Sequence, residues 1–428
     1  DLTDKDQIVN KDAVSMLVSL GIIEGKPDGS YAPTENVDRA QMAKMLSVIM
    51  NKGVDNSALY QSVNSGLVDV NTNWAKGHIN YCYTTGIIAG RGNGKFDPSA
   101  TVTALEAAKM LLVAVGYDPA IEGFEGADWA INVSVRADEQ GIFEGFTKDL
   151  SAPLNRDDAA LLIYNALDVE MIQSYTTNNY PIAYSDHRTI LADKYGVIKV
   201  QGVVVANEWA SLASDDGDAA LKEGKTTIYN GEGIFSTTGN TTVSKEDASL
   251  KTQTFNVSTP VDMLGKTVNL YIKKTTILAD STVYGDPVVS DVNTVVTTGE
   301  TVLYSGAKDP QVDYDKLLGE NGLTDKDAKY FWNYNSGKYI PNTTEKYGDK
   351  TANVKGATLT IIDNNGDGEV DYVLSVEKAL ADITSVNSKK ETVTIRTLGT
   401  LDNKDVVGYE DMAKEDVVLY VQYGGRTY

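Results

Sequence analysis

The chain has 428 residues, of which 42% are hydrophobic and 23% are charged, and at roughly 100–200 residues per domain it should form two to four folded domains. Its 60 acidic residues outnumber the 38 basic ones and give a net charge of −22, which argues against a nucleic-acid-binding protein because few cations remain to neutralise phosphates. One cysteine, Cys82, and two scattered histidines exclude an internal disulfide framework and a multi-cysteine metal site, and they argue against a histidine-based one.

Helix signals fill the first 170 residues and recur three times. A Gly-Ile-x-x-Gly motif stands at 21–25 and 86–90, and a Gly-Ile-Phe-Glu-Gly version stands at 141–145. The first two copies keep a constant offset of 65 residues, whereas the third has a central loop three residues shorter. Constant register over this length indicates a repeat architecture, in which single units cannot bury their apolar faces alone.

Each copy predicts a pair of helices. In copy one, Val14, Leu17 and Val18 form the apolar stripe of a first helix, and the glycine of each copy that follows, Gly21 here, suits a left-handed helix end. The second helices begin after the N-cap residues Asp38, Thr103 and Asn155, each with a polar residue three positions on. Met42, Met45, Leu46 and Ile49 then give an apolar face, so we expect three helix pairs to pack around a shared core.

These repeats resemble S-layer homology (SLH) domains. Copy two carries the family's pattern most fully, with Leu67-Val-Asp69, Trp74-Ala75, Phe96-Asp-Pro98 and Thr103-x-x-Glu106. The predicted repeats are 1–60, 61–120 and 121–174. The resemblance implies a pseudo-threefold arrangement within one chain, with ligand grooves between adjacent copies, in an exported protein tethered to a cell-wall polysaccharide that often bears a pyruvylated sugar.

The candidate polymer-binding residues follow from the repeat positions. An arginine in the first turn of a helix lies beside unpaired backbone N–H groups, and its guanidinium fits a carboxylate. Tryptophan offers a flat face to a sugar, and glycine lets a sugar approach the backbone. The candidates are Arg39, Arg156, Trp74, Trp129, Asp4, Asp69, Gly25, Gly90 and Gly145. The alternatives are solvated arginines in ordinary salt bridges, tryptophans that anchor the core and glycines that only serve turns.

The copies depart from the family's pattern in ways that bear on binding. Copy two has Ala104 where the arginine belongs, and copy one has Val9 where the tryptophan belongs. Copy three lacks the aspartate. We therefore expect one or two working grooves and not three.

The chain changes character near residue 175, where strand signals replace helix signals. Tyr175–Pro181 is the expected linker, and a weaker break falls near 308–313. The fold class is therefore a multidomain protein in which the helical repeats are followed by all-β sandwich-like or barrel-like modules at 182–307 and 308–428. The expected strands are Val197–Val205, Thr267–Lys273, Thr358–Ile362, Val370–Val376, Thr392–Thr397 and Val417–Gln422.

A possible calcium loop lies in the second β module. Oxygen-bearing side chains at Asp363, Asn365, Asp367 and Asp371, with Gly366 at the turn, have the alternating spacing of a Ca²⁺ loop. Position 12 is Leu374 and not glutamate, so the loop is not a complete EF-hand. The competing interpretation is a polar hairpin loop, which Asn, Asp and Gly also favour.

The sequence favours a non-enzymatic surface protein. Motifs for nucleophilic, phosphate-binding or zinc chemistry are absent, although a pair of carboxylates for a glycosidase can never be excluded in so acidic a chain. No apolar run is long enough for a membrane span and no signal peptide opens the chain, so it is either intracellular or a processed or trimmed chain. With the SLH resemblance, we expect an extracellular, wall-anchored component of an S-layer or similar array. Its partners would be secondary cell-wall polysaccharide or peptidoglycan and other copies of itself. The alternatives are an adhesin, a carbohydrate binder or, less favoured, a wall-anchored hydrolase.

Overall fold

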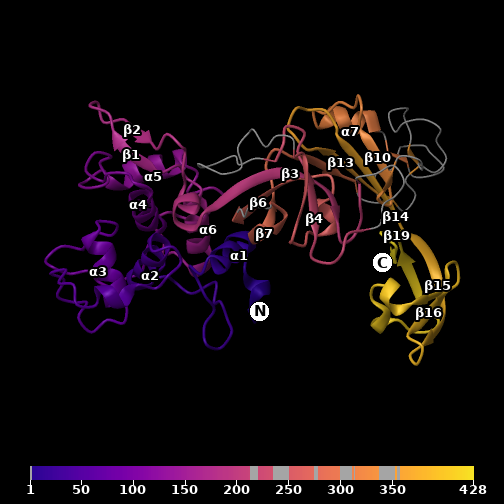
Figure 1. Cartoon of the computed structure of the whole chain (residues 1–428), viewed down its shortest axis with the longest axis horizontal. Coiled ribbons are helices and arrows are strands. Elements are labelled where there is room, and N and C mark those ends of the chain that lie inside the picture. Colours follow the sequence, from indigo (N-terminus) through magenta and orange to yellow (C-terminus); the bar gives the residue numbers. More distant parts are fainter. Residues whose placement is uncertain are drawn as a thin grey trace. The chain divides into compact units, whose positions relative to one another are not determined.

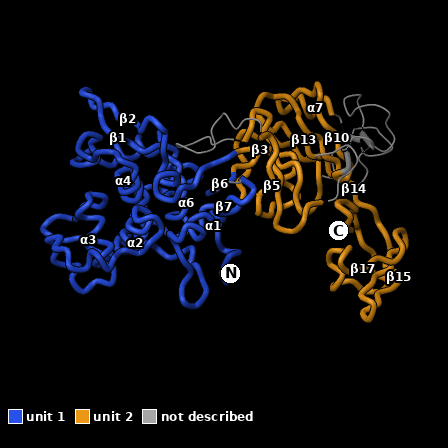
Figure 2. Tube along the Cα trace, viewed as in Figure 1, with its two compact units in different colours: residues 1–200, 235–244, 270–286 blue, residues 201–234, 245–269, 287–428 orange. Residues whose placement is uncertain are grey.

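The computed structural model describes residues 2–212, 220–234, 250–273, 278–298, 311–312, 314–336, 352–353 and 357–428. The chain forms two compact units (Figure 2). The first contains 1–200, 235–244 and 270–286, and the second contains 201–234, 245–269 and 287–428.

Six α-helices of the first unit are arranged as three consecutive pairs (Figure 1). The pairs are α1 (Lys11–Ser19) with α2 (Arg39–Met50), α3 (Lys76–Thr84) with α4 (Ala104–Val115), and α5 (Trp129–Glu139) with α6 (Arg156–Leu167), and two 3₁₀ turns, η1 (Lys5–Gln7) and η2 (Ser57–Tyr60), lie among the first of them. This confirms the predicted helix pair in each of the three copies.

The helix ends follow from their capping residues. Asp38 and Thr103 each form a complete capping box with the residue three positions on, and the Asn155 side chain accepts from the Asp158 N–H. The glycines after the first helices, Gly21, Gly86 and Gly141, have φ of 69°, 79° and 70°. Because a side chain is strained in this left-handed region, these positions favour glycine.

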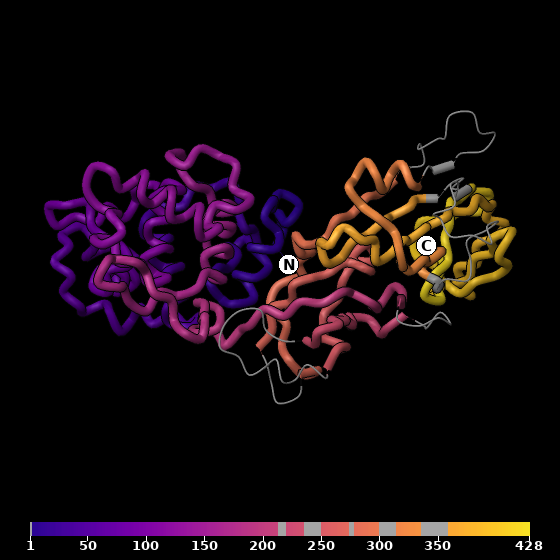
Figure 3. Tube along the Cα trace, turned by 90° about the horizontal axis from the view of Figure 1, so that it is seen from above, coloured from indigo at the N-terminus to yellow at the C-terminus, as the bar shows by residue number. Residues whose placement is uncertain are grey.

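The three pairs interlock in a cycle. Each first helix packs on the second helix of the preceding copy: α3 on α2, α5 on α4, and α1 on α6. Three backbone hydrogen bonds close the same cycle at the starts of the second helices, from Val37 N to Leu154 O (2.8 Å), from Leu154 N to Val102 O (2.7 Å) and from Val102 N to Val37 O (2.9 Å). The expected pseudo-threefold arrangement is therefore present, and Figure 3 shows the repeats from a second direction.

One hydrophobic core serves all three copies. It contains Leu17, Leu46, Ile79, Leu111 and Ile163, from five of the six helices, and all are fully buried. Val18, which we assigned to the apolar stripe of the first helix, is exposed. Val14 and Leu17 are buried, so the buried stripe of α1 is narrower than the sequence suggested.

The expected linker is a β-hairpin. Strand β1 (Ile172–Tyr175) pairs antiparallel with β2 (Pro181–Ala183), and Tyr175 lies opposite Pro181. The turn residues that suggested a linker therefore reverse the chain within the first unit, which continues to residue 200. A short helical turn, η3 (Leu191–Tyr195), leads from this hairpin into the long strand β3 (Val197–Asn207).

The remaining chain is built mainly from antiparallel strands. A five-stranded sheet has the order β5-β4-β3-β6-β7, and the boundaries between the two units fall within β3, β6 and β7. Its other strands are β4 (Thr226–Tyr229), β5 (Thr252–Phe255), β6 (Thr267–Lys273) and β7 (Thr282–Val289), with 3₁₀ turns η5 (Val261–Met263) and η6 (Leu278–Asp280) before β6 and β7. Strands β3 and β6 confirm the strands predicted at 197–205 and 267–273. Residues that favour strands, such as Val, Ile and Thr, dominate both segments.

A second five-stranded sheet, in the second unit, has the order β11-β10-β14-β13-β8. Its strands are β8 (Thr294–Thr297), β10 (Lys329–Trp332), β11 (Asn335–Ser336), β13 (Ala357–Asp363) and β14 (Tyr372–Glu377), and helix α7 (Tyr314–Glu320) supplies Tyr314 and Leu318 to its core. Strand β8 lies within the module expected at 182–307, yet it pairs with β13 of the module expected at 308–428. The break expected near 308–313 lies mostly outside the described residues, which include 311–312 as strand β9 (Gln311–Val312), paired with β12 (Ala352–Asn353).

The last part of the second unit is a four-stranded antiparallel sheet with the order β17-β16-β15-β18. Its strands are β15 (Ala379–Asn387), β16 (Thr392–Ile395), β17 (Gly399–Asp402) and β18 (Val417–Tyr420), and the 3₁₀ turns η7 (Asn403–Asp405) and η8 (Tyr409–Asp411) lie between β17 and β18. The short pair β19 (Gln422–Tyr423) and β20 (Arg426–Thr427) follows. This sheet has its own small core around Ile383 and Val393.

Candidate functional site

Two grooves lie between the helical copies. Groove 1 has a volume of about 280 Å³ and its lining includes Glu24, Gly25, Lys44, Met45, Trp74 and Arg156. Groove 2 has a volume of about 370 Å³ and its lining includes Ala89, Gly90, Lys109, Met110, Trp129 and Arg39. These are matching positions of successive copies, so the two grooves are built on one plan.

Each groove takes residues from all three copies. In groove 1, Arg156 comes from copy three, Gly25 and Lys44 from copy one, and Trp74 from copy two. Groove 2 repeats this pattern one copy further round the cycle, with Arg39 from copy one and Trp129 from copy three. A single copy therefore cannot form a groove, and each groove depends on the packing of the whole repeat region.

The two arginines join neighbouring copies. Arg39 donates from Nε to Phe96 O (2.8 Å) and from Nη2 to Ala89 O (2.6 Å), and its guanidinium lies 4.5 Å from the centre of the Phe96 ring. Arg156 makes the same contacts with copy one, from Nε to Tyr31 O (2.8 Å) and from Nη2 to Glu24 O (3.3 Å), and lies 4.8 Å from the Tyr31 ring centre. Both also line a groove, so the side chains that join neighbouring copies also form part of the groove walls.

The environment of the two arginines differs. Arg39 is only 4% exposed, and burial lowers its pKa to about 10, while Arg156 is half-buried. Because a buried cation interacts more strongly with a nearby anion than a solvated one does, either side chain is suited to a carboxylate that reaches it.

The helix N-termini are not free to bind an anion, contrary to our expectation. The N–H groups of Arg39 and Arg156 donate to Ala100 O (3.0 Å) and Glu35 O (2.8 Å) of the next copy. The N–H groups of the residues that follow, Ala40 and Asp157, donate to Pro98 O (2.9 Å) and Pro33 O (3.1 Å). The interlocking of the copies supplies these acceptors, so a ligand would be met by side chains and not by the helix backbone.

Asp4 and Asp69 hold the turns beside the grooves. Asp4 accepts from the N–H groups of Tyr31 and Ala32 (both 2.8 Å), and Asp69 accepts from those of Phe96 (2.9 Å) and Asp97 (2.8 Å). These bonds fix the aromatic residues on which the arginines stack. The hydrogen bonds to Tyr31 and Ala32 lower the pKa of Asp4, and at Asp69 the two N–H donors outweigh burial and likewise lower the pKa.

The surrounding structure disfavours a side chain at each of the three candidate glycines. A Cβ at Gly25 would lie 2.9 Å from Leu2 Cδ2, and one at Gly90 would lie 3.0 Å from Lys95 O. Gly145 has φ of 75°, a conformation that side chains rarely adopt. Gly25 and Gly90 also form part of the groove walls, so the turn and the groove depend on the same residues.

The two tryptophans differ in exposure. Trp74 is 59% exposed on the wall of groove 1. Trp129 packs partly against the helical core, and Lys109 Nζ lies 5.8 Å from its ring centre in groove 2. Trp74 is therefore mostly open to solvent at groove 1, whereas Trp129 both lines groove 2 and packs against the core.

The third contact between copies lacks the groove residues that grooves 1 and 2 share. Ala104 replaces the arginine, Lys148 replaces the aromatic partner, Val9 replaces the tryptophan and Leu161 replaces the groove lysine. Lys148 instead forms a 2.5 Å ion pair with Asp158. Four changes at matching positions separate this place from grooves 1 and 2.

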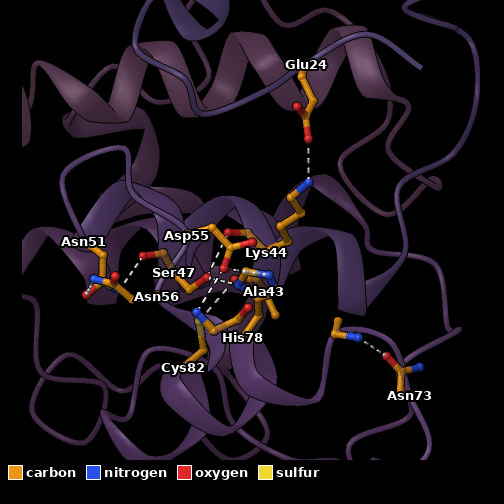
Figure 4. Close-up of polar contacts among 12 residues, drawn as sticks. Glu24, Ala43, Lys44, Ser47, Asn51, Asp55, Asn56, Asn73, His78 and Cys82 are labelled. Atoms are coloured by element: carbon orange, nitrogen blue, oxygen red, sulfur yellow. Dashed lines mark hydrogen bonds and ion pairs between the residues drawn. The ribbon is translucent and has the colours of Figure 1, made fainter. Parts of the chain in front are cut away.

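A polar network joins α3 to α2 and to the loop that follows α2 (Figure 4). Ser47 Oγ lies 2.5 Å from His78 Nδ1, and His78 Nε2 lies 3.6 Å from Asp55 Oδ1. Cys82 donates to Ala43 O (3.4 Å) beside them. Ser47 and His78 are both buried and neither lines groove 1 or groove 2, so the Ser–His–Asp arrangement supports the helix contact that positions Lys44 and Trp74.

The acidic loop between β13 and β14 is folded around its first aspartate. Buried Asp363 accepts from Asn365 N, Gly366 N and Gly368 N at 3.1, 2.7 and 2.9 Å, and Asp371 accepts from Asn364 N at 2.8 Å. Desolvation, with Asp363, Asp367 and Glu369 nearby, raises the pKa of Asp371. Among the described residues, no three Asp, Glu, His or Cys side chains are grouped as metal ligands, so calcium stays a prediction.

The sequence singled out the arginines and tryptophans but missed the groove lysines. Lys44 and Lys109 occupy matching positions on α2 and α4 and line grooves 1 and 2. Lys44 Nζ forms an ion pair with Glu24 (2.9 Å), and Arg91 forms one with Glu106 (2.8 Å) in groove 2. The constant offset between the first two copies pairs these lysines and was the signal that could have identified them.

Comparison with known proteins agrees with this architecture. The S-layer homology domain family matches residues 1–43 and 68–108, which contain the first helix and the start of the second helix in each of copies one and two. These segments are SLH domains, and copy three joins them through the closed cycle of helix contacts and hydrogen bonds.

Similar proteins include surface proteins and a hydrolase. The chain is 28% identical over 234 residues to a cell surface protein of Thermoanaerobacter kivui, covering 54% of this chain and 28% of that protein. It is 32% identical over 113 residues to an S-layer protein of Bacillus licheniformis, covering 26% of this chain and 12% of that protein. It is also 31% identical over 172 residues to an amylopullulanase of Thermoanaerobacterium thermosulfurigenes, covering 37% of this chain and 9% of the enzyme.

The chain spans less than a third of the length of each of these relatives. Its SLH domains and the names of the surface-protein relatives indicate a location at the cell wall or cell surface. Within the described residues, we find no helix with the length and apolar composition of a membrane span.

Proposed function

We propose that this chain attaches a surface protein non-covalently to an acidic cell-wall polysaccharide, and that grooves 1 and 2 are its two binding sites. The observation that carries the proposal is the repetition of one groove plan: an arginine stacked on an aromatic ring, a lysine, a tryptophan and a glycine at matching positions. A carboxylate-bearing sugar needs a cation for its charge and an apolar face for its ring, and each groove offers both.

The charge of the chain makes the grooves selective. The chain as a whole carries −22, so an acidic polymer is repelled by most of its surface. Groove 1 concentrates Lys26, Lys44 and Arg156 around one acidic residue, Glu24. We infer that this local reversal of charge directs the polymer into the groove.

The second part of the proposal concerns the β modules. We propose that they form the structural, outward part of an S-layer or similar lattice in which copies of the chain contact one another. The S-layer protein among the relatives supports this function, although its match covers only 26% of this chain. An adhesin or carbohydrate-binding surface protein remains the alternative for the same β modules.

A hydrolase has weaker support. One relative is named as an amylopullulanase, and groove 2 contains two carboxylates, Glu106 and Glu125. However, Glu106 already accepts from Thr103 N (3.0 Å) through one oxygen and pairs with Arg91 (2.8 Å) through the other. Its carboxylate thus serves the helix start and an ion pair, which leaves it poorly placed for proton transfer.

The anchoring proposal is tested by sedimenting the full chain with intact cell walls and with walls stripped of acidic polymer by hydrofluoric acid. The Lys44→Ala/Lys109→Ala variant removes one cation from each groove without breaking the arginine contacts between copies. We expect binding to intact walls only, weakened at least tenfold in this variant and unchanged in Lys404→Ala, an exposed lysine outside the grooves. Equal binding to both wall preparations would contradict recognition of the acidic polymer.

A further inference from the structure

Strand β18 is an open edge of the last sheet. In the order β17-β16-β15-β18 it stands at one end, and within the described residues it pairs with β15 alone, with Leu419 opposite Leu380 and Val417 opposite Asp382. The backbone N–H and C=O groups on its other side therefore point away from the sheet. Such groups are a ready template for another strand.

The outer face of this edge is apolar. Val417 and Leu419 are 61% and 59% exposed, and Leu380 on β15 is 65% exposed. We call these three residues the edge patch. The opposite face of the same strands packs Val418 and Tyr420 against the small core around Ile383, so burial of that core does not explain the apolar residues of the patch.

Two of the other edge strands carry features that block pairing. Strand β7, at the end of the first five-stranded sheet, contains Gly285, Asp286 and Pro287, and β17, at the far end of the last sheet, contains Gly399 and Asp402. Proline, glycine and charged residues are the usual means of protecting an edge. The four residues of β18, Val417-Val-Leu-Tyr420, include none of them.

We propose that β18 pairs with β18 of a second copy of this chain, antiparallel and about a two-fold axis. Pairing centred on Val418 places Val417 of each copy opposite Leu419 of the other, so the two edge patches become continuous. Asp416 then lies opposite Tyr420, and no two acidic residues face each other across the new pair. On a chain with a net charge of −22, an edge that avoids like-charge contact is suited to self-association.

The contact is weak by its size, since four residues a side and three exposed side chains form much less than a standard interface. Attachment to a common wall would raise the local concentration of the copies and let many such contacts act together. The inference therefore rests on the proposed array function and names one of its contacts.

The test uses cysteine cross-linking of the full chain in solution, without wall. A mixture of Val417→Cys and Leu419→Cys variants should give cross-linked dimers, because these positions face each other, at least tenfold above the yield of either variant alone. Thr400→Cys, on the opposite edge strand β17, is the matched control. The native Cys82 is buried, and burial raises the pKa of its thiol, so it should contribute little background.

Three outcomes would overturn the inference. They are equal yields in the mixture and in the single variants, a cross-link between Leu419→Cys and Thr400→Cys that indicates head-to-tail pairing, and unchanged cross-linking when Leu380→Lys is added to both variants. Wall sedimentation of the same proteins separates this result from the anchoring proposal. Dimer formation without wall binding would contradict the anchoring proposal alone. Wall binding without dimer formation would contradict the β18 contact alone.

Discussion

Arg39 and Arg156 illustrate how one residue type serves both the fold and the site. Each guanidinium donates to two backbone carbonyls of a neighbouring copy and stacks on an aromatic ring, while its outer edge lines a groove. The sequence identified these positions through the repeat alignment. It could not show that the carbonyl acceptors come from another copy, because that contact depends on the cyclic packing of three segments.

Substitution of Arg39 should therefore reduce stability as well as binding. Arg39→Ala leaves Phe96 O and Ala89 O without their donor in a buried place, which should lower the free energy of unfolding by about 2–3 kcal/mol. Arg156→Ala should cost less, because that side chain is only half-buried. Urea unfolding of the two variants measures the difference. An unchanged Arg39→Ala midpoint together with lost wall binding would mean that Arg39 acts on the ligand only.

His78 should make the helical repeats sensitive to mild acid. Burial outweighs the attraction of Asp55 and lowers the pKa of His78 below 6.5, and Lys44 acts in the same direction as burial. The unfolded chain then takes up the proton first as pH falls, so the stability due to neutral His78 is complete above about pH 6.5 and declines below it. Thermal unfolding between pH 7.5 and 5 should show a shallower decline for His78→Gln than for the unchanged chain. Parallel curves would contradict this role.

At the scale of elements, local signals predicted more than long-range ones. Caps at Asp38, Thr103 and Asn155 and glycines after the first helices depend on a few neighbouring residues, and the structure confirms them. Tyr175–Pro181 has the composition of a linker, but it forms a hairpin turn because the flanking residues pair across it. Composition cannot distinguish a turn from a linker, since both use the same residues.

The turn held by Asp69 offers a test at this scale. Asp69→Ala removes the acceptor of the Phe96 and Asp97 N–H groups, so Phe96 should shift beneath Arg39 and groove 2 should loosen. We expect a loss of about 1–3 kcal/mol in the free energy of unfolding and weaker wall binding. Asp69→Asn, which retains an acceptor oxygen, should lose less. Normal stability with abolished wall binding would instead assign Asp69 to direct contact with the ligand.

The acidic loop between β13 and β14 gives a separate prediction. Because Asp371 lies partly buried near Asp363, Asp367 and Glu369, a bound Ca²⁺ would relieve their mutual repulsion. Millimolar Ca²⁺ should then raise the thermal midpoint of the second unit by a few degrees, and Asp367→Ser should abolish the rise. Mg²⁺ at the same concentration is the control. A midpoint indifferent to Ca²⁺ would leave the polar hairpin as the correct interpretation.

At the scale of the whole molecule, the three copies form a closed cycle with three contacts between copies. Only two of these contacts retain the groove residues. The sequence predicted the copies and the loss at Ala104. It did not show that Ala104, Lys148 and Val9 belong to the same place, because these residues come from three copies and meet only after folding. The structure thereby turns scattered departures from the repeat into one altered site, and it predicts two ligands for each chain.

The most direct test is isothermal titration calorimetry of the full chain with an acidic wall-polysaccharide fragment released from intact walls. The account predicts two sites for each chain, one remaining in Lys44→Ala and one in Lys109→Ala, with two sites retained in the Lys148→Ala control. Three sites in the unchanged chain, or the loss of a site in Lys148→Ala, would show that the third place also binds. The absence of any binding heat at all, confirmed by equilibrium dialysis, would contradict the grooves as the polymer sites.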